Sequence, residues 1–186
     1  LLELGLRDIK LEINTLGDTE DRARFRKDFI LWLEKNIERL DPDSQKRIYS
    51  NPLRVLDSKN KDTQKVLAEA PALIDTISEK SRERFASLKA ILERFEIPFI
   101  VNPRLVRGLD YYCHTAFEIT CDQLGSQATV CGGGQYDGLS EQLGGPNVPS
   151  IGWAIGLERL LLLLGDSIPS ADPPDIYFVN KGEDAE

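Results

Sequence analysis

The residues Arg104-Leu-Val-Arg107-Gly-Leu-Asp-Tyr-Tyr112 open the most informative stretch of this sequence. It continues through Cys131-Gly-Gly-Gly-Gln-Tyr-Asp-Gly138 and closes with Gly152-Trp-Ala-Ile-Gly-Leu-Glu-Arg159. Residues 101–186 hold only 4 of the 23 Lys+Arg but 12 of the 31 Asp+Glu, so they carry the whole net charge of −8. An isolated arginine in such an acidic, glycine-rich segment suits an anion, which its planar guanidinium can hold through two parallel hydrogen bonds. An ion pair with a nearby carboxylate such as Asp110 or Asp137 is the alternative, and for a single arginine the sequence favours neither.

Length and composition limit the possible classes of protein. A chain of 186 residues with 41% hydrophobic residues can form one or two domains around a real core. It contains no Met, so we expect an internal piece of a longer protein. No apolar run approaches the ~20 residues that a bilayer span needs, and we expect no membrane partner. The acidic balance disfavours nonspecific nucleic-acid binding over the whole surface, but it leaves a local RNA contact open in the first hundred residues.

The cysteines and the histidine do not have the spacing of a metal centre. Cys113, Cys121 and Cys131 lack the CxxC pattern of zinc sites, and His114 is the only histidine. We therefore predict that the protein builds no metal site of its own, and that it works in a reducing, cytoplasmic compartment.

The first half of the chain predicts a strand followed by helices. Apolar and polar residues alternate over residues 8–14, as in a half-buried strand, and we assign residues 1–17 to a sheet. Asp18 or Thr19 then caps a helix whose apolar positions recur from Phe25 to Leu40, until Asp41-Pro42 ends it. Residues 51–60 form a turn-rich connector, and short helical pieces follow near residues 62–76. Ser78 caps a longer helix, whose apolar stripe consists of Phe85, Leu88, Ile91, Leu92 and Phe95. We assign residues 18–97 to a helical subdomain and expect both apolar stripes to be core.

After Pro98 the period of the sequence changes to that of strands. We predict strands at residues 99–102, 115–121, 127–131 and 150–155, with a hairpin turn at Leu124-Gly125-Ser126. A helix begins at Gly156, and we expect its inward residues to be Leu157, Leu160, Leu161 and Leu164. Mostly antiparallel strands with a helix behind them make an α+β sheet domain over residues 98–170. Residues 171–186 predict a linker followed by the opening strand of a further domain.

Three features of the second half suit a small polar ligand. The glycines at 132–134 let a ligand approach the backbone where a Cβ would collide, although a tight turn is the more common reason for such a run. Tyr111, Tyr112 and Tyr136 offer flat rings and hydroxyls, although half-buried sheet tyrosines would look the same. Arg159, early in the last helix, could stack on a base or meet a phosphate.

These segments together resemble histidyl-tRNA synthetases. Arg107-Gly-Leu-Asp-Tyr-Tyr112 and Gly133-Gly-Gln-Tyr-Asp-Gly-Leu139 look like the two histidine-specific signatures of that family, and Gly152 to Arg159 looks like motif three of class II synthetases. Asn51-Pro-Leu-Arg-Val-Leu-Asp-Ser-Lys59 resembles part of the insertion domain of bacterial members. The resemblance extends over essentially all 186 residues. It implies an internal fragment with part of the class II antiparallel sheet, a mainly helical insertion subdomain, and the start of an anticodon-binding domain at residues 171–186.

The resemblance also implies an activity and a set of site residues. The family activates L-histidine with ATP, accompanied by Mg²⁺, to histidyl-adenylate and transfers it to histidine tRNA as a homodimer. By position, Arg107 is the implied catalytic residue, because a preorganised cation stabilises the charge that develops during adenylation. The implied histidine-binding residues are Arg107, Tyr111, Tyr112, Gly132, Gly133, Gly134 and Tyr136. The implied ATP-binding residues are Gly156 and Arg159. The resemblance also implies that the insertion subdomain contacts the acceptor arm of the tRNA.

The sequence departs from the family pattern at two places. Gln135 stands where the second signature usually carries an arginine, and Cys113-His114 stand where the family often has Asn and a basic residue. Motifs one and two, which complete the active site and the dimer interface in the family, are absent, so we expect the fragment by itself to be inactive.

Two alternatives remain. One is a non-catalytic, histidine-sensing regulatory subunit of ATP phosphoribosyltransferase, and the helical insertion and the intact first signature weigh against it. The other is a helical RNA-contact module, and the ligand signatures weigh against that.

Overall fold

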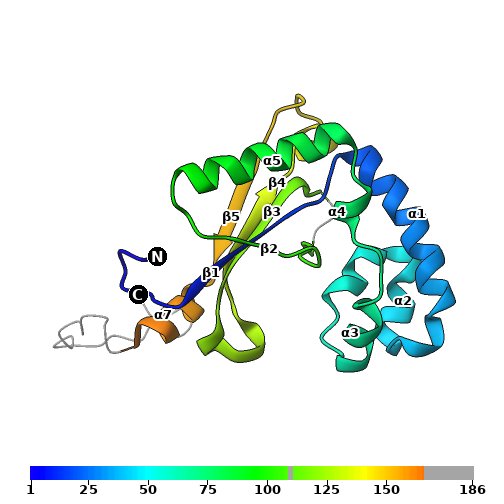
Figure 1. Cartoon of the computed structure of the whole chain (residues 1–186), viewed down its shortest axis with the longest axis horizontal. Coiled ribbons are helices and arrows are strands. Elements are labelled where there is room, and N and C mark those ends of the chain that lie inside the picture. The colour runs from blue at the N-terminus through cyan, green and yellow to red at the C-terminus, as the bar shows by residue number, and fades with distance from the viewer. Residues whose placement is uncertain (109–110, 166–186) are drawn as a thin grey trace, which may run out of the picture.

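The computed structural model describes residues 1–108 and 111–165, and its centre is a five-stranded sheet in the order β2-β1-β3-β4-β5 (Figure 1). The strands are β1 Ile9–Thr15, β2 Ile100–Val101, β3 Cys113–Cys121, β4 Thr129–Gln135 and β5 Ile151–Ile155. β1 and β2 pair in parallel, and the other three neighbouring pairs are antiparallel. The predicted α+β fold with a mostly antiparallel sheet is therefore confirmed.

Most of the helices gather beside one end of this sheet (Figure 1). This helical cluster consists of α1 Thr19–Lys35, α2 Pro42–Ser50, α3 Lys61–Leu67 and α4 Leu73–Thr76. Helix α5, Glu79–Arg94, instead runs over the sheet and contacts β3. The remaining described helices are α6 Leu139–Gln142 and α7 Leu157–Leu164, with short 3-10 helices at Ile37–Arg39, Pro52–Asp57 and Asp122–Gln127. In residues 1–108 and 111–165, every helix is too short or too polar to cross a bilayer.

The helical cluster and the sheet share one hydrophobic core. Phe25, Phe29 and Leu33 on α1 are at most 1% exposed, and their core cluster includes Tyr112 and Ala116 at the start of β3. Burying side chains of this size stabilises the fold by roughly 1.5–3 kcal/mol each. The prediction that this stripe is core is confirmed for Phe25, Phe29, Leu33 and Leu40, but it is wrong for Ile37, which is 37% exposed.

The apolar stripe predicted on α5 is core only at one end. Phe85 is buried, but Ile91 and Phe95 are 54% and 69% exposed. The stripe therefore extends beyond the part of α5 that other described residues cover, and the prediction of a fully buried stripe is wrong.

The inward face predicted for α7 is also wrong in part. Leu157 and Leu161 are 65% and 53% exposed, whereas Leu160 and Leu164 are half-buried as predicted. Because α7 follows β5, an edge strand of the sheet, the described residues cover only one side of this leucine-rich helix.

Asp41-Pro42 begins a helix as well as ending one. Helix α1 stops at Lys35, a 3-10 turn follows, and Asp41 caps α2 by accepting hydrogen bonds from the N–H groups of Asp43 and Ser44, both at 3.0 Å. Pro42 occupies the first helical position, where its missing N–H costs nothing. The single helix predicted through Leu40 is thus wrong, because this pattern marks a start as much as a stop.

The hairpin between β3 and β4 forms where predicted, but with different boundaries. Its connection is the 3-10 segment Asp122–Gln127, in which Gly125 has φ 61°, instead of a tight turn at 124–126. Strand β4 begins at Thr129 and runs on to Gln135, four residues beyond the predicted end. This extension carries all three glycines into the sheet.

Candidate active site

Arg107 lies against the face of β3 and β4. Its Nη1 donates to Oε1 of Glu118 at 2.5 Å, and its guanidinium carbon lies 5.7 Å from the centroid of the Tyr112 ring. Both side chains of this ion pair are 21% exposed, and Nε of Arg107 is buried without a hydrogen-bond partner among the described residues. The ion pair that the sequence left open is present, but its acid is Glu118 instead of Asp137; Asp110 lies outside the described residues.

Glu118 is a site residue that the sequence interpretation missed. It lies on β3 directly opposite Gly132, and its second oxygen accepts from Oγ1 of Thr129 at 2.9 Å. The signal was present in the sequence, because Glu118 is the one acid in the alternating stretch 115–121. Only the strand register, however, reveals that it faces Arg107.

The glycines of β4 make room for two of the site's side chains. Gly132 and Gly134 are alternate positions of the strand, so they share a face. A Cβ on Gly132 would lie 2.5 Å from Nη1 of Arg107, and a Cβ on Gly134 would lie 2.9 Å from Cδ1 of Tyr112. The prediction that these glycines follow a strand is wrong: they lie within one, and their missing Cβ atoms let Arg107 and Tyr112 lie close to the backbone.

Gly133 and Gly152 bring β5 close in the same way. A Cβ on Gly133 would lie 2.6 Å from Cβ of Trp153, its partner in register, and a Cβ on Gly152 would collide with the ring of Tyr136. These glycines therefore also let the protein's own side chains and strands pack closely.

Tyr111, Tyr112 and Tyr136 form one aromatic cluster. The ring centroid of Tyr111 lies 4.7 Å from that of Tyr112 and 5.4 Å from that of Tyr136, and the rings of Tyr112 and Tyr136 are nearly perpendicular at 5.8 Å. Burial, and then the hydrogen bond with Tyr112, raise the pKa of Tyr111, so its phenol is neutral near pH 7. The cluster offers hydroxyl groups and ring edges beside the guanidinium of Arg107.

Arg159 is linked to Arg107 through the sheet. Its Nη1 donates to the backbone oxygen of Thr129 at 2.6 Å, and the side chain of Thr129 donates to the Glu118 that holds Arg107. The N–H of Gly156 already donates to the oxygen of Val130 at 3.0 Å, so this amide is not available to a ligand. The two predicted arginines are thus joined by one chain of hydrogen bonds through Thr129 and Glu118.

Arg104 belongs to the framework instead of to the site. Its Nη2 donates to the backbone oxygens of Ala68 and Ala70, at 3.2 and 2.8 Å, at the end of α3. Burial lowers its pKa. This arginine joins the loop before β3 to the helical cluster.

Gln135 accepts a hydrogen bond from an arginine on another element. Its Oε1 accepts from Nη2 of Arg84 on α5 at 3.0 Å, and its Nε2 lies 2.8 and 2.7 Å from the two carboxylate oxygens of Asp137. A guanidinium therefore reaches the second signature from α5, at the position where the sequence carries a glutamine.

Comparison with known proteins identifies the family. A family model described as histidyl-tRNA synthetase matches residues 29–160. The chain belongs to the histidyl-tRNA synthetase family. It is 59% identical to the histidine--tRNA ligase of Prochlorococcus marinus strain MIT 9211 over 98% of its own length, and 60% identical to that of strain AS9601 over all of it. It spans 43% and 44% of these relatives, less than half of their length.

Solved synthetase structures agree with this family assignment. The apo histidyl-tRNA synthetase of S. aureus superimposes with a TM-score of 0.67 at 38% identity, over 88% of this chain and 40% of that one. The enzyme from Nostoc sp. PCC 7120 gives a TM-score of 0.53 at 18% identity, over 88% of this chain and 40% of that one, and supports the fold alone. The expected anticodon-binding segment, residues 171–186, lies outside the described residues.

Proposed function

We propose that this chain works as part of a histidine--tRNA ligase, which activates L-histidine with ATP to histidyl-adenylate and then transfers it to histidine tRNA. The single observation that carries the proposal is the juxtaposition of Arg107, the three tyrosines and the glycines of β4 in a chain of this family. Relatives 59% and 60% identical over nearly the whole chain are named histidine--tRNA ligases, which favours the ligase over the regulatory-subunit alternative.

In this proposal Arg107 contacts the carboxylate of histidine and the α-phosphate. It is the catalytic residue because the phosphorane-like charge of adenylation develops next to it, where a fixed cation is most effective. Its buried Nε has no acceptor among the described residues, and an oxygen of the substrate would supply one. Glu118 keeps the guanidinium in place but does not occupy every hydrogen-bond donor, since a guanidinium has five N–H groups.

The tyrosines and glycines form the histidine pocket of the proposal. Tyr111 and Tyr112 line the side chain of the substrate, and Gly132, Gly133, Gly134 and Tyr136 lie beneath it. Neutral phenols suit an imidazole, which needs one donor and one acceptor at neutral pH. Because Tyr112 is only 7% exposed, most of its contribution is to fix the shape of the pocket.

Arg159 and Gly156 are proposed at the ATP end of the site. Arg159 would cover the adenine and reach toward the outer phosphates, with Mg²⁺ arriving as part of the MgATP substrate. Gly156 lies directly beside Arg159, since a Cβ there would be in ordinary contact with Cδ of Arg159 at 3.4 Å. We further propose that the complete protein is a cytoplasmic homodimer and that the helical cluster approaches the tRNA acceptor arm.

The test is histidine-dependent ATP–pyrophosphate exchange by the complete protein. Arg107→His should lower the exchange rate by two to three orders of magnitude with little change in the KM for ATP, since one preorganised charge contact is worth roughly 3–4 kcal/mol. Arg82→His is the matched control, because Arg82 lies on α5 with its side chain 54% exposed. Near-normal exchange by Arg107→His would reduce Arg107 to a structural residue.

The same assay distinguishes the histidine pocket from a folding effect. Tyr111→Phe should raise the KM for histidine more than that for ATP, because a polar partner left unpaired is penalised. Equal changes in both KM values would place Tyr111 outside the histidine pocket.

A further inference from the structure

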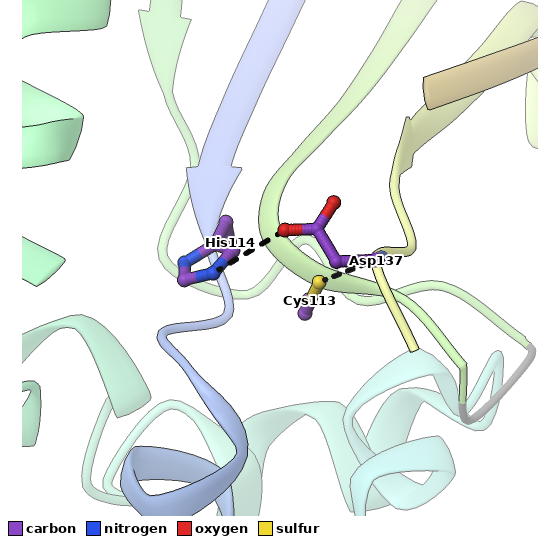
Figure 2. Close-up of side chains that lie close together, drawn as sticks. All are labelled: Cys113, His114 and Asp137. Carbon is purple, nitrogen blue, oxygen red and sulfur yellow. Dashed lines mark hydrogen bonds and ion pairs between the residues drawn. The ribbon is translucent and has the colours of Figure 1, made fainter. Parts of the chain in front are cut away.

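Three potential metal ligands converge where the two signature segments meet (Figure 2). The sulfur of Cys113, a ring nitrogen of His114 and a carboxylate oxygen of Asp137 all lie within 4.8 Å of one another. Nε2 of His114 is 3.9 Å from Oδ2 of Asp137, which is too long for a hydrogen bond. Cys113 is buried, and the other two side chains are 17% and 26% exposed.

A distortion of β3 makes this convergence possible. Successive side chains of a regular strand point to opposite faces, so Cys113 and His114 should not share a target. The register of β3 with β4 shifts between Cys113 and Ala116, and His114 has φ 49°, in the left-handed region that non-glycine residues rarely adopt. Bulges of this kind re-aim side chains. Two backbone hydrogen bonds to residues 16–17 hold the distorted position, at 2.6 and 2.7 Å.

The imidazole of His114 has an unused donor or acceptor. Its Nδ1 is buried and has no hydrogen-bond partner among the described residues. Burial, followed by the charge of Arg84, lowers the pKa of His114, so the ring is neutral near pH 7 and keeps a lone pair. Nε2, the nitrogen that faces Asp137, is the one offered to a metal, and a metal bound there would leave Nδ1 to carry the ring proton.

We propose that Cys113, His114 and Asp137 bind one Zn²⁺ ion, with water as the fourth ligand. Thiolate, imidazole and carboxylate are the three side-chain ligands that zinc uses, and a tetrahedral ion would hold its ligand atoms roughly 3.3–3.8 Å apart. The His114–Asp137 separation of 3.9 Å is already close to that range. Closing the remaining distances requires only small side-chain rotations.

The surroundings of the cluster resemble an outer coordination shell. The N–H of Asp137 points to Sγ of Cys113 at 3.4 Å, as donors to a zinc-bound thiolate do. The carboxylate of Asp137 is oriented by Nε2 of Gln135 and by the N–H of Ser150 at 3.1 Å. Such supporting hydrogen bonds fix the direction of metal ligands.

The charged groups around the cluster are compatible with a bound cation. Arg22 on α1 and Arg84 on α5 act on it as positive charges, and Asp18 and Asp137 act on it as negative charges. Arg22 donates to the backbone oxygen of Tyr112, and Arg84 to Gln135. Once Cys113 is a thiolate, the three negative groups outnumber the two guanidinium groups.

The ion would join the two segments that carry the tyrosines. Cys113 and His114 follow Tyr111 and Tyr112 directly, and Asp137 follows Tyr136. A zinc ion would therefore be a positioning element for this face of the sheet, and it takes no part in the proposed adenylation. The sequence predicted no metal site because no two of these ligands show zinc-site spacing; the bulge and the strand pairing bring them together.

The experiment measures metal in the complete protein, purified without chelators and dialysed against Zn²⁺. Elemental analysis should find one zinc per chain. Replacement by Co²⁺ should give the near-ultraviolet charge-transfer absorption of a cobalt–thiolate bond. Cys113→Ala and His114→Ala should each weaken zinc binding by more than roughly 100-fold, since changes to supporting residues alone cost 10–100-fold. Cys121→Ala is the matched control, because Cys121 is equally buried and reduced but lies outside the cluster.

Binding should also depend on pH. Zinc binds cysteine as a thiolate and must displace the thiol proton of Cys113, so affinity should fall as the pH drops below neutral. Absence of zinc and of the cobalt–thiolate band in the wild-type protein would overturn the proposal. So would full binding by Cys113→Ala. If Cys113→Ala does not fold, the cobalt spectrum of Cys121→Ala decides, because the thiolate band must persist there. Zinc content and the cobalt spectrum can be measured without catalytic activity, so they test the metal site separately from the proposed function.

Discussion

At the scale of single residues, the position of Arg107 depends on an acid on one strand and an absent side chain on the next. Glu118 of β3 holds one guanidinium nitrogen, and Gly132 of β4 leaves the space in which that nitrogen lies. The same guanidinium approaches the face of Tyr112. A side chain added at position 132 would therefore displace the guanidinium of Arg107 before it disturbed the backbone of the strand.

Gly132→Ala is expected to reduce catalysis more than stability. The new Cβ would lie 2.5 Å from Nη1 of Arg107, so the guanidinium must shift, and a misplacement of about 1 Å costs on the order of 10²-fold in rate. Pyrophosphate exchange and thermal unfolding of the complete protein check this. Gly138→Ala is the control, since only Nε2 of Gln142, at 3.8 Å, lies near its Cβ, and it should leave both properties nearly unchanged. Full activity in Gly132→Ala would show that Arg107 tolerates displacement.

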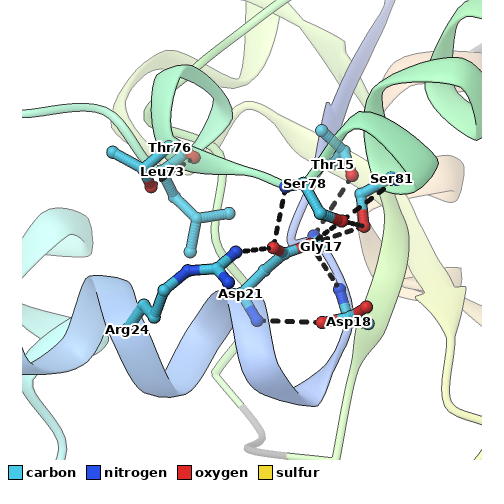
Figure 3. A network of polar contacts seen from close by, with 9 residues as sticks. All are labelled: Thr15, Gly17, Asp18, Asp21, Arg24, Leu73, Thr76, Ser78 and Ser81. Carbon is cyan, nitrogen blue, oxygen red and sulfur yellow. Dashed lines mark hydrogen bonds and ion pairs between the residues drawn. The ribbon is translucent and has the colours of Figure 1, made fainter.

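At the scale of elements, Asp21 ties helix α1 to the start of α5 across 57 residues of sequence (Figure 3). Asp18 and Asp21 form a reciprocal capping box at the beginning of α1. The carboxylate of Asp21, only 1% exposed, also accepts from the N–H of Ser78 at 2.8 Å and from the hydroxyl of Ser81, and it pairs with Arg24. One buried carboxylate thus fixes where the chain leaves the helical cluster for the sheet.

Asp21→Asn should lower the free energy of unfolding of residues 1–186 by about 3 kcal/mol at pH 7, because it breaks a buried charged network. Burial alone would raise the pKa of Asp21, but the hydrogen bonds from Ser81, Ser78 and Asp18 outweigh it and leave the pKa lowered. The unfolded state therefore binds the proton more readily, so this stability is present above the ordinary Asp pKa and is lost as the pH falls toward the folded value.

Urea unfolding at a series of pH values below about 5 checks both points, since the variant should lose less stability than the wild type on acidification. Asp62→Asn is the control, because that carboxylate is 83% exposed and forms an exposed ion pair with Lys65, so less than about 0.5 kcal/mol should be lost. Identical pH profiles for wild type and Asp21→Asn would rule out a contribution of this carboxylate to acid sensitivity.

At the scale of the whole molecule, apolar side chains collect along β5 and α7. Ile151 and Trp153 on the edge strand are 63% and 64% exposed, and Leu162 on α7 is 74% exposed. Large exposed apolar patches often mark interfaces in folded proteins. The proposed site lies on the neighbouring strands, so its surroundings depend on whatever covers this edge.

Residues 1–186 alone are expected to fold but to show no histidine-dependent pyrophosphate exchange. The shared core of the helical cluster and β3 supports folding. The resemblance implies that the family's second motif, with an arginine for the α-phosphate, is not part of residues 1–186. Correct orientation of the reacting groups accounts for ~7–11 kcal/mol of such a barrier. The assay compares residues 1–186 with the complete protein. Even slow exchange above background by the shorter chain would show that our division of the active site is wrong.

The sequence by itself determined the features that depend on neighbouring positions along the chain. Alternation over residues 8–14 predicted β1, and the α1 stripe predicted core residues. Side-chain oxygens predicted caps at Asp18 or Thr19 and at Ser78, and the caps are Asp18 and Ser78. Each of these is a relation between residues at most a few positions apart, where periodicity and capping chemistry act directly. The signatures also placed Arg107 and the tyrosines in one set by resemblance.

Only the tertiary structure decided which residues meet across strands. The partner of Arg107 is Glu118, the glycines lie inside β4, and Asp137 comes within reach of Cys113 and His114. Strand register and a bulge set these relations, and a shift of one residue would turn each side chain to the other face. The outward leucines of α7 have the same origin, because helical periodicity fixes which residues share a face, and only the packing of other elements determines whether that face is covered.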